Sequence, residues 1–278
     1  MMKEILKKIT IVLVSYRSSE KLKKFITYIP KETPIFIVDN SNDKKLIEIF
    51  KKKKNVSVFF KKNNGYGSSI NYASKRIKTP YFFVVQPDVL GIKKNSLLNF
   101  YKYAKLIKDN FSVIGPHFLN AAKSGHYQTN TKYKIKEIHN VHGSTMFFNN
   151  MNFKKNKGFD ENFFLYWEET DYTKRAKKNG YKAYQLNLVN VKHEKGKAVI
   201  TKNMKEEKKL ENLYTWHFIW SKFYFFKKHY GKILALIYFI PVLIRIMFRM
   251  CIYKLFKSEK YIKYYCRWDG LRASILSK

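Results

Sequence analysis

Cysteine is almost absent from this chain, because only Cys251 and Cys266 occur among its 278 residues. Two cysteines near the C-terminus exclude a disulfide framework and a zinc site built from cysteine. The chain also lacks the long apolar stretch of a signal peptide near its start, where the apolar run Ile9–Val14 is too short and is typical of a buried strand. We therefore expect a protein that stays in the cytoplasm.

Acidic residues and arginine are scarce as well. The chain has 56 Lys and Arg but only 20 Asp and Glu, which gives a formal net charge of +36, and only seven of the 56 are Arg. Proteins that read nucleic-acid sequences depend on Arg for paired contacts with bases and phosphates. The composition thus argues against specific nucleic-acid recognition, whereas so positive a surface attracts anionic lipid and phosphorylated substrates.

Apolar residues, by contrast, are plentiful: 45% of the chain is hydrophobic and 17% is aromatic, enough for a sizeable buried core. Between residues 9 and 116, short apolar runs alternate with Lys-rich stretches of helical length. This alternation is typical of strand–helix–strand units and predicts an α/β fold on a parallel sheet. The expected strands are Ile9–Val14, Pro34–Val38, Val56–Phe60, Tyr81–Val85 and Ser112–Gly115.

The alternation is lost between residues 117 and 165, where turn residues surround one apolar strand, Thr145–Phe148. A helix is expected to begin near Trp167, because three acids would lie in its first turn, and to end at Gly180. Two short strands around residues 182–192 follow. We expect this folded domain to cover residues 1–205.

Residues 206–278 differ in kind and are expected to form a helical segment. Twelve uncharged, mostly apolar residues, Ile233–Ile244, are interrupted by Pro241, which should kink or end the helix. A run of twelve is short of the roughly 20 residues that a spanning helix needs. Flanking aromatic and basic side chains favour a segment that lies in the interface of an anionic membrane or re-enters the membrane. The alternative is a hydrophobic helix packed on the domain.

Polar residues directly after the first two expected strands are the first site candidates, because ligands of open α/β sheets bind outside the carboxyl ends of strands. Ser15 and Tyr16 follow the first strand, and Asp39 follows the second. The Asp39 carboxylate is placed to accept hydrogen bonds from a nucleobase or ribose. Its alternative role is to cap the helix that follows.

A glycine-rich loop follows the third strand and contains Asn64, Gly65 and Gly67, with Asn71 shortly after. Glycine allows the backbone to approach a ligand closely or to adopt a positive φ. The pattern is not a Walker loop or a complete dinucleotide-binding motif, and a simple turn is the alternative.

Asp88 and His193 are candidate metal ligands. Asp88 comes at the end of the fourth strand, where one carboxylate can suffice for a divalent cation that bridges two phosphates. His193, followed by Gly196, offers an imidazole that could bind the same ion. The alternatives are a turn-forming Asp after Pro87 and a structural histidine.

Three acids lie close together at Glu168, Glu169 and Asp171. Their simple explanation is a favourable interaction with the N-terminus of a helix. Carboxylates this close also repel one another and raise at least one pKa, which makes each of them a candidate general base.

Taken in order, these motifs resemble family 2 glycosyltransferases of the GT-A fold, over about residues 9–196. The nearest likeness is to the bacterial rhamnosyltransferase-like branch, which builds lipopolysaccharide, capsule or related cell-envelope glycans. The motifs that carry the resemblance are Val-Ser-Tyr, Val-Asp-Asn-Ser, Asn-x-Gly-Tyr-Gly-x-x-x-Asn, Pro-Asp, Gly-Phe-Asp-Glu-x-Phe-Phe-Leu-Tyr-Trp-Glu-Glu-x-Asp-x-x-x-Arg and His-x-x-Gly.

The resemblance implies a role for each matching residue. Asp88 and His193 would bind Mn²⁺ or Mg²⁺, although Gln86 replaces the first acid of the family's Asp-x-Asp motif. Glu169 would be the catalytic base, with Glu168 and Asp171 as alternatives. The residues implied in the nucleotide-sugar site are Ser15, Tyr16, Asp39, Asn64, Gly65, Gly67, Asn71 and Gln86, and those implied beside the sugar or acceptor are His142, Gly143 and Trp167.

The implied activity is an inverting, metal-dependent sugar transfer from a nucleoside-diphosphate sugar such as dTDP-rhamnose. The acceptor would be a hydroxyl of a cell-surface glycan or a lipid-linked glycan at the inner face of the cytoplasmic membrane. Residues 9–116 would form the nucleotide-sugar half and residues 117–205 the acceptor half. The alternatives are a basic protein that binds membrane or RNA, or an inactive glycosyltransferase-like subunit.

Overall fold

The computed structural model describes residues 1–119, 132–194 and 198–277. The chain divides into two compact units, which we name the sheet unit and the helical unit. The sheet unit comprises Met1–Glu161 and Glu168–Ile200, and the helical unit comprises Thr201–Lys278 together with the short segment Asn162–Trp167. The six residues directly before the Glu168–Glu169 pair are therefore packed within the helical unit.

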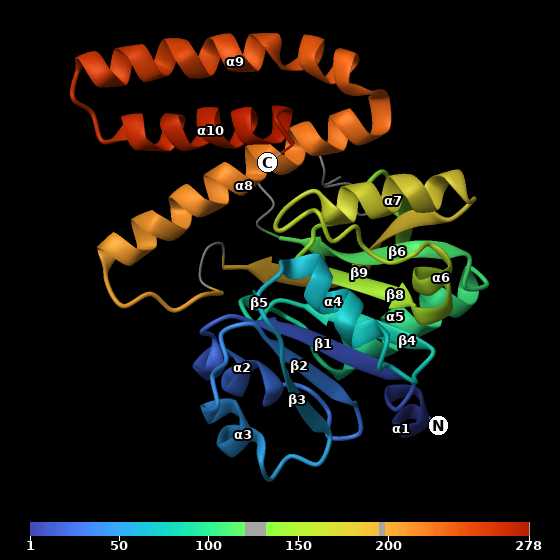
Figure 1. The fold of residues 1–278 in the computed structure, drawn as a ribbon. Coiled ribbons are helices and arrows are strands. Elements are labelled where there is room, and N and C mark those ends of the chain that lie inside the picture. Colours follow the sequence, from blue (N-terminus) through green and yellow to red (C-terminus); the bar gives the residue numbers. More distant parts are fainter. Residues whose placement is uncertain (120–131, 195–197, 278) are drawn as a thin grey trace. The chain divides into compact units, whose positions relative to one another are not determined.

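The sheet unit is built on a sheet with nine strands among the described residues, in the order β3-β2-β1-β4-β8-β6-β9-β5, with β7 pairing with β9 (Figure 1). Strands β1 to β4 are parallel, and β8 is antiparallel to β4. The strands are β1 Ile9–Ser15, β2 Ile35–Asp39, β3 Val56–Phe60, β4 Tyr81–Val85, β5 Val89–Leu90, β6 Phe111–Phe118, β7 Ile135–Ile138, β8 Thr145–Asn149 and β9 Lys182–His193.

Helices cover both faces of this sheet because its central strands are apolar on both sides. On one face, Ile11 and Leu13 of β1 join a core with side chains of α2, α3 and α5. On the other face, aromatic rings of β4, β8, α6 and α7 pack at centroid distances of 4.9–5.5 Å, as between Phe82, Phe148 and Tyr172. The helices are α1 Met2–Leu6, α2 Ser19–Ile26, α3 Lys45–Phe50, α4 Tyr66–Ser74, α5 Lys94–Leu106, α6 Asn150–Lys155 and α7 Glu168–Lys178.

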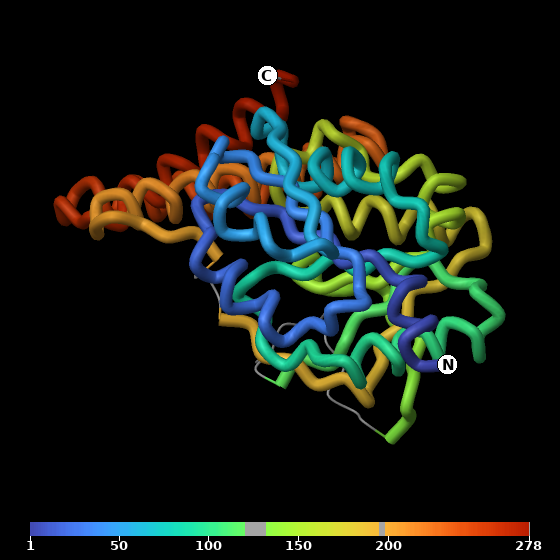
Figure 2. Tube along the Cα trace, turned by 90° about the horizontal axis from the view of Figure 1, so that it is seen from below, coloured from blue at the N-terminus to red at the C-terminus, as the bar shows by residue number. Residues whose placement is uncertain are grey.

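The predicted α/β fold is confirmed, and every strand predicted up to residue 148 is present within a few residues of its expected bounds. The prediction of two short strands around residues 182–192 is wrong, because β9 is a single strand of 12 residues. Its length follows from its neighbours, since it pairs with β5, β6 and β7 along different parts of its course. Strands β6 and β9, which are distant in sequence, run side by side in both views (Figures 1 and 2).

Strand register brings the predicted site residues to one edge of the sheet. Ser15 pairs with Asp39 in the parallel β1–β2 ladder, so both lie where their strands end. Val85 at the end of β4 pairs with Thr145 at the start of antiparallel β8. Residues 142–144, just before β8, therefore lie at the same edge as the residues that follow β4.

The helical unit consists of three long helices: α8 Met204–Tyr230, α9 Lys232–Leu255 and α10 Lys260–Ile275. Asn203 caps α8 by accepting a hydrogen bond from the Glu206 amide, and Gly231 with a φ of 89° separates α8 from α9. The helices share a core formed by Ile219, Phe223, Ala235, Phe239, Ile246 and Leu271.

Helix α9 departs from two sequence-based expectations. It continues through Pro241, so the prediction that this proline could end the helix is wrong, and packing of Phe239 and Ile246 on either side of the proline holds the helix together. At 24 residues, α9 is also long and apolar enough to span a bilayer by length and composition, unlike the twelve-residue run expected. The helix is longer than the uncharged run because Arg245 and Arg249 interrupt the run, whereas the helix continues past both.

Gly270 of α10 provides a test of the helical packing. A Cβ at this position would lie 2.6 Å from the Trp216 carbonyl oxygen of α8 and 2.9 Å from Ile219 Cγ2. Gly to Ala normally stabilises a helix by about 1 kcal/mol, but here we expect Gly270→Ala to destabilise the protein by about 1–3 kcal/mol. Thermal unfolding measures this, with the exposed Ile262→Ala as control. A Gly270→Ala protein more stable than wild type would contradict the close packing.

Candidate active site at the carboxyl edge of the sheet

The Glu168–Glu169 pair begins α7, directly after Tyr166 and Trp167, which both adopt positive φ values of 68° and 71°. Both carboxylates lie against Gly143, since a Cβ there would be 3.5 Å from Glu169 Oε2 and 3.8 Å from Glu168 Oε1. The backbone before β8 therefore lies beside the two acids. Gly143, which the resemblance places beside the sugar or acceptor, thus lies next to the two candidate bases.

The two carboxyl groups differ in their ionisation. Burial raises the pKa of Glu169 to about 7. Burial and the neighbouring Glu169 charge raise the pKa of Glu168 well above its usual value, and Glu168 Oε2 accepts no hydrogen bond from the described residues. A carboxylate that titrates near neutral pH is well suited to remove a proton at that pH. Of the two, Glu169 is therefore the better candidate base.

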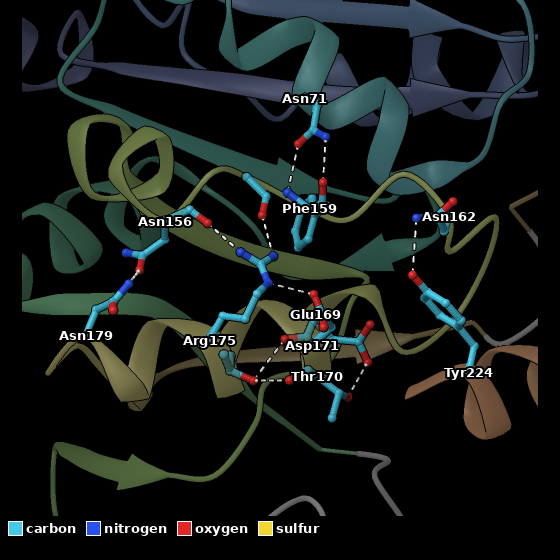
Figure 3. Close-up of polar contacts among 12 residues, drawn as sticks. Asn71, Asn156, Phe159, Asn162, Glu169, Thr170, Asp171, Arg175, Asn179 and Tyr224 are labelled. Atoms are coloured by element: carbon cyan, nitrogen blue, oxygen red, sulfur yellow. Dashed lines mark hydrogen bonds and ion pairs between the residues drawn. The ribbon is translucent and has the colours of Figure 1, made fainter. Parts of the chain in front are cut away.

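Two residues that the sequence analysis missed hold Glu169 in place. Thr170 Oγ1 donates to Glu169 Oε1 at 3.4 Å, as Figure 3 shows, and Asn140 Nδ2 donates to Thr170 Oγ1 at 2.7 Å. Thr170 is the unspecified position of the Glu-Glu-x-Asp motif and Asn140 lies in none of the motifs, so the sequence marked neither residue.

Asp171, the third predicted acid, has a different environment. It is completely buried, and its Oδ2 accepts a hydrogen bond from Arg175 Nε at 2.8 Å (Figure 3). The same guanidinium donates to the carbonyl oxygens of Asn156 and Gly158. Asp171 therefore holds Arg175, which in turn binds the backbone of residues 156 and 158. This environment favours a structural role for Asp171 over that of a general base.

Asp88 and His193 lie next to each other, as their predicted sharing of a cation requires. The pairing of β5 with β9 sets Val89 opposite His193, which brings His193 Nε2 to 3.3 Å from Asp88 Oδ2. Asp88 is 2% exposed, and its Oδ1 accepts no hydrogen bond from any residue that the structure describes. Two ligands of one octahedral cation lie about 3 Å apart, so this pair fits a divalent ion.

His142 links the Asp88–His193 pair to the glutamates. Its ring centroid is 5.0 Å from that of His193, and its neighbour Gly143 contacts both glutamates. Nδ1 of His142 accepts a hydrogen bond from the Ser144 amide at 3.1 Å, which fixes the ring. Among residues 1–119, 132–194 and 198–277, no group of three or more His, Cys, Asp or Glu side chains is arranged to hold a metal ion.

Tyr66 connects the two halves of the site and was not among the predicted site residues, although it lies within the Asn-x-Gly-Tyr-Gly motif. Its hydroxyl donates to the Gly143 carbonyl oxygen at 2.9 Å. Burial raises the Tyr66 pKa well above its usual value, and negative charge on Glu168, Asp88 and Glu169 adds to this shift. All three acids are thus within electrostatic range of one buried phenol, which stays protonated and donates.

Asp39 and Ser15 lie where predicted, at the ends of their strands, but both are fully buried. Asp39 Oδ2 accepts from the amides of Ser41 and Asp43, and Oδ1 accepts from the Ser41 hydroxyl. Ser15 Oγ lies 3.0 Å from Ser18 Oγ. Asp39 therefore shapes the loop after β2, and its contact with a nucleotide stays a prediction.

The glycine-rich loop leads into α4, where Gly65 with a φ of 103° is the residue before the helix. Gly67 allows close packing, since a Cβ would lie 3.0 Å from Phe159 Cβ and 3.6 Å from Glu168 Cβ. Asn71 is buried and exchanges two hydrogen bonds with the Phe159 backbone, at 2.9 Å each (Figure 3). Asn71 thus fastens α4 to the segment before the glutamates, whereas Asn64 is exposed.

The remaining predicted residues are placed as follows. Gln86 follows β4, and its backbone N–H donates to the Ser144 carbonyl oxygen at 2.8 Å. Tyr16 is half-buried under the Arg17 guanidinium. Trp167 belongs to the helical unit, where its ring packs 5.1 Å from that of Phe225. Gly196 of the His-x-x-Gly motif, like part of the predicted acceptor half, lies outside the described residues.

Comparison with solved structures identifies the fold. The chain aligns with S. aureus TarS 1–349 in complex with UDP-GlcNAc at a TM-score of 0.56 and 17% identity, over 97% of this chain and 90% of that one. It also aligns with GalNAc-T7 bound to UDP, GalNAc and Mn²⁺ at a TM-score of 0.55 and 14% identity, over 78% and 49%. The chain has the GT-A fold.

Sequence comparison points in the same direction as the GT-A fold. The chain is 23% identical over 207 residues to the low-salt glycan biosynthesis hexosyltransferase Agl10 of Haloferax volcanii, a match that spans 66% of each protein. No protein-family model matches the chain. The resemblance to glycosyltransferases is therefore supported by sequence and by fold.

The raised pKa of Glu169 has a measurable consequence for stability. Relative to its ordinary value of 4.5, the folded chain holds this proton up to about pH 7, so ionisation destabilises the fold as the pH rises through that window. We expect Glu169→Gln to gain stability over wild type between about pH 5 and about pH 8, on the order of 1–3 kcal/mol. Denaturant unfolding at both pH values measures it, with the exposed Glu48→Gln as control. Equal differences at the two pH values would contradict the raised pKa.

Proposed function

We propose that this protein is a glycosyltransferase that moves a sugar from a nucleoside diphosphate to an acceptor hydroxyl. The observation that carries the proposal is the arrangement at one sheet edge: half-buried Glu169, with its pKa raised to about 7, and the Asp88–His193 pair, joined through His142 and Gly143. A base for the acceptor and a site for the diphosphate are the two parts that such a transfer requires.

Glu169 is the proposed base. Its carboxylate accepts the proton of the acceptor hydroxyl as the oxygen attacks the anomeric carbon of the donor sugar. The bond between that carbon and the diphosphate oxygen breaks, and the electron pair leaves with the nucleoside diphosphate. One displacement from the opposite face inverts the configuration, and proximity of the two bound substrates lowers the barrier further.

Asp88 and His193 are the proposed ligands of a divalent cation, Mn²⁺ or Mg²⁺. A cation there would supply charge neutralisation for the departing diphosphate. Gln86 stands where relatives carry a first acid, so the site has one carboxylate fewer to bind the ion. Tyr66 stays protonated and, by holding Gly143, keeps the backbone that faces both halves of the site in position.

The proposed nucleotide-sugar contacts are the predicted ones at the ends of β1, β2 and β4. The similar proteins indicate which classes of donor sugar and acceptor to test first. Agl10 is a glycan-biosynthesis hexosyltransferase and TarS was solved with UDP-GlcNAc, so a hexose-type donor and a glycan acceptor of the cell envelope are the natural first substrates. The resemblance to the rhamnosyltransferase-like branch adds dTDP-rhamnose to the donors worth testing.

Removing the base should abolish transfer. We expect Glu169→Gln to lower kcat about 10²–10⁴-fold, because general-base catalysis contributes about that much. Release of nucleoside diphosphate from UDP-GlcNAc and dTDP-rhamnose in the presence of acceptor glycan measures the rate. Glu48→Gln, exposed and remote, should retain full activity. If Glu169→Gln transfers sugar normally while Glu168→Gln is inactive, the base is Glu168.

Removing the proposed cation ligand Asp88 should weaken nucleotide binding. We expect Asp88→Asn to weaken Mn²⁺-dependent UDP or dTDP binding by about tenfold or more, since it removes the charged ligand. Calorimetry with and without Mn²⁺ measures this, and Glu169→Gln should bind the nucleotide almost as wild type does. Failure of the wild-type protein to bind either nucleotide would instead favour a basic binding protein or an inactive subunit.

A further inference from the structure

Helix α9 carries a continuous apolar stripe that faces away from the core of the helical unit. Its side chains are exposed, among them Ile233 at 74% and Ile244 at 62%. The positions recur at steps of three or four residues, so they share one face of the helix. The members of this stripe are Ile233, Ile237, Ile240, Ile244, Met247, Phe248, Cys251 and Leu255.

The opposite side of α9 is already occupied. Ala235, Phe239 and Ile246 are buried against α8 and α10. The stripe is therefore not the face of α9 that packs in the core of the helical unit. At 1.5 Å per residue it runs about 33 Å, far more than scattered surface hydrophobic residues would explain.

The charge around the stripe is of one sign. No acidic residue occurs between Glu211 and Glu259, whereas this stretch holds eight Lys and Arg. Lys232 stands at the start of α9, and Arg245 is exposed directly after Ile244 of the stripe. A second copy of the chain would bring two such positive surfaces together, which repulsion opposes, whereas anionic lipid headgroups complement them.

We infer that the stripe of α9 docks in the plane of an anionic membrane surface, with its apolar side chains at the boundary between headgroups and acyl chains. The basic residues beside it contact lipid phosphates, each adding about 1 kcal/mol. This inference concerns lipid binding alone and does not depend on the proposed sugar transfer.

Neighbouring helices explain why α9 lies on the membrane rather than across it. The ammonium group of Lys222 of α8 lies 5.7 Å from the ring centroid of Phe239, two turns into α9. Arg249 hydrogen-bonds to the Tyr264 hydroxyl of α10, whose exposed surface carries further charges. Crossing the bilayer would take these charges into hydrocarbon, at several kcal/mol in total, because α9 cannot move without its partners.

Flotation with vesicles tests the docking. We expect the full-length protein to float with vesicles that contain phosphatidylglycerol and to float less with phosphatidylcholine alone. Ile244→Asp should reduce binding about tenfold or more, because a charge enters the centre of the stripe. Met151→Asp in the sheet unit is the matched control, since Met151 is exposed to 61% against 62% for Ile244. Circular dichroism and thermal unfolding verify that both variants fold.

Depth measurements test the orientation. With Cys251 and Cys266 replaced by Ser, single cysteines at residues 237, 244 and 251 are spin-labelled in turn, each about 10 Å further along the helix. In-plane docking predicts the same shallow depth for all three labels. Depths that change by about 10 Å from one label to the next would show a spanning helix and overturn the inference.

Absence of binding would overturn it as well. If the wild-type protein ignores anionic vesicles at low salt, or if Ile244→Asp floats as well as Met151→Asp does, the stripe is not a membrane face. A concentration-dependent dimer in light scattering that Ile244→Asp dissociates, without vesicle binding by the wild-type protein, would assign the stripe to a second copy.

Discussion

The packing of buried Glu168 beside half-buried Glu169 at the start of α7 is the constraint on which the site depends. Their carboxylates lie beside the backbone at Gly143, and burial raises the pKa of both, which moves the ionisation of Glu169 towards neutral pH. The neighbouring Asp171 takes no part in this balance, since Arg175 neutralises it and uses it to fasten the preceding turn. Three acids that look equivalent in sequence thus have two different tasks.

Alternating apolar runs were enough to predict the α/β fold, because each central strand is buried on both faces and leaves a local signature. The extent of β9 could not be predicted, since its length depends on pairing with β5, β6 and β7, which the sequence of residues 182–193 does not encode. Asp88 and His193 were each predicted singly, but their 3.3 Å separation arises from the pairing of β5 with β9. Asn140 and Thr170 escaped prediction because their contact is entirely tertiary.

The length of α9 in the helical unit, like that of β9, could not be predicted from its own sequence. A twelve-residue uncharged run and a proline suggested a short, interrupted segment, whereas packing against α8 and α10 supports a 24-residue helix through Pro241. Residues Asn162–Trp167 belong to the helical unit, and Glu168 is the next residue of the chain. Side chains such as Ser221, which donates to the Leu165 carbonyl oxygen, hold that segment.

Glu169 changes its ionisation near neutral pH, and the proposed chemistry depends on this change. Carbon-13 NMR of protein labelled at the glutamate carboxyl carbons measures this directly, with the Glu169→Gln spectrum used to assign the resonance. We expect a resonance that titrates with a midpoint at about 7 and disappears in the variant. A Glu169 resonance that titrates near 4.5, its ordinary value, would contradict the role of Glu169 as base, because the carboxylate would then be an ordinary solvated acid at the start of a helix.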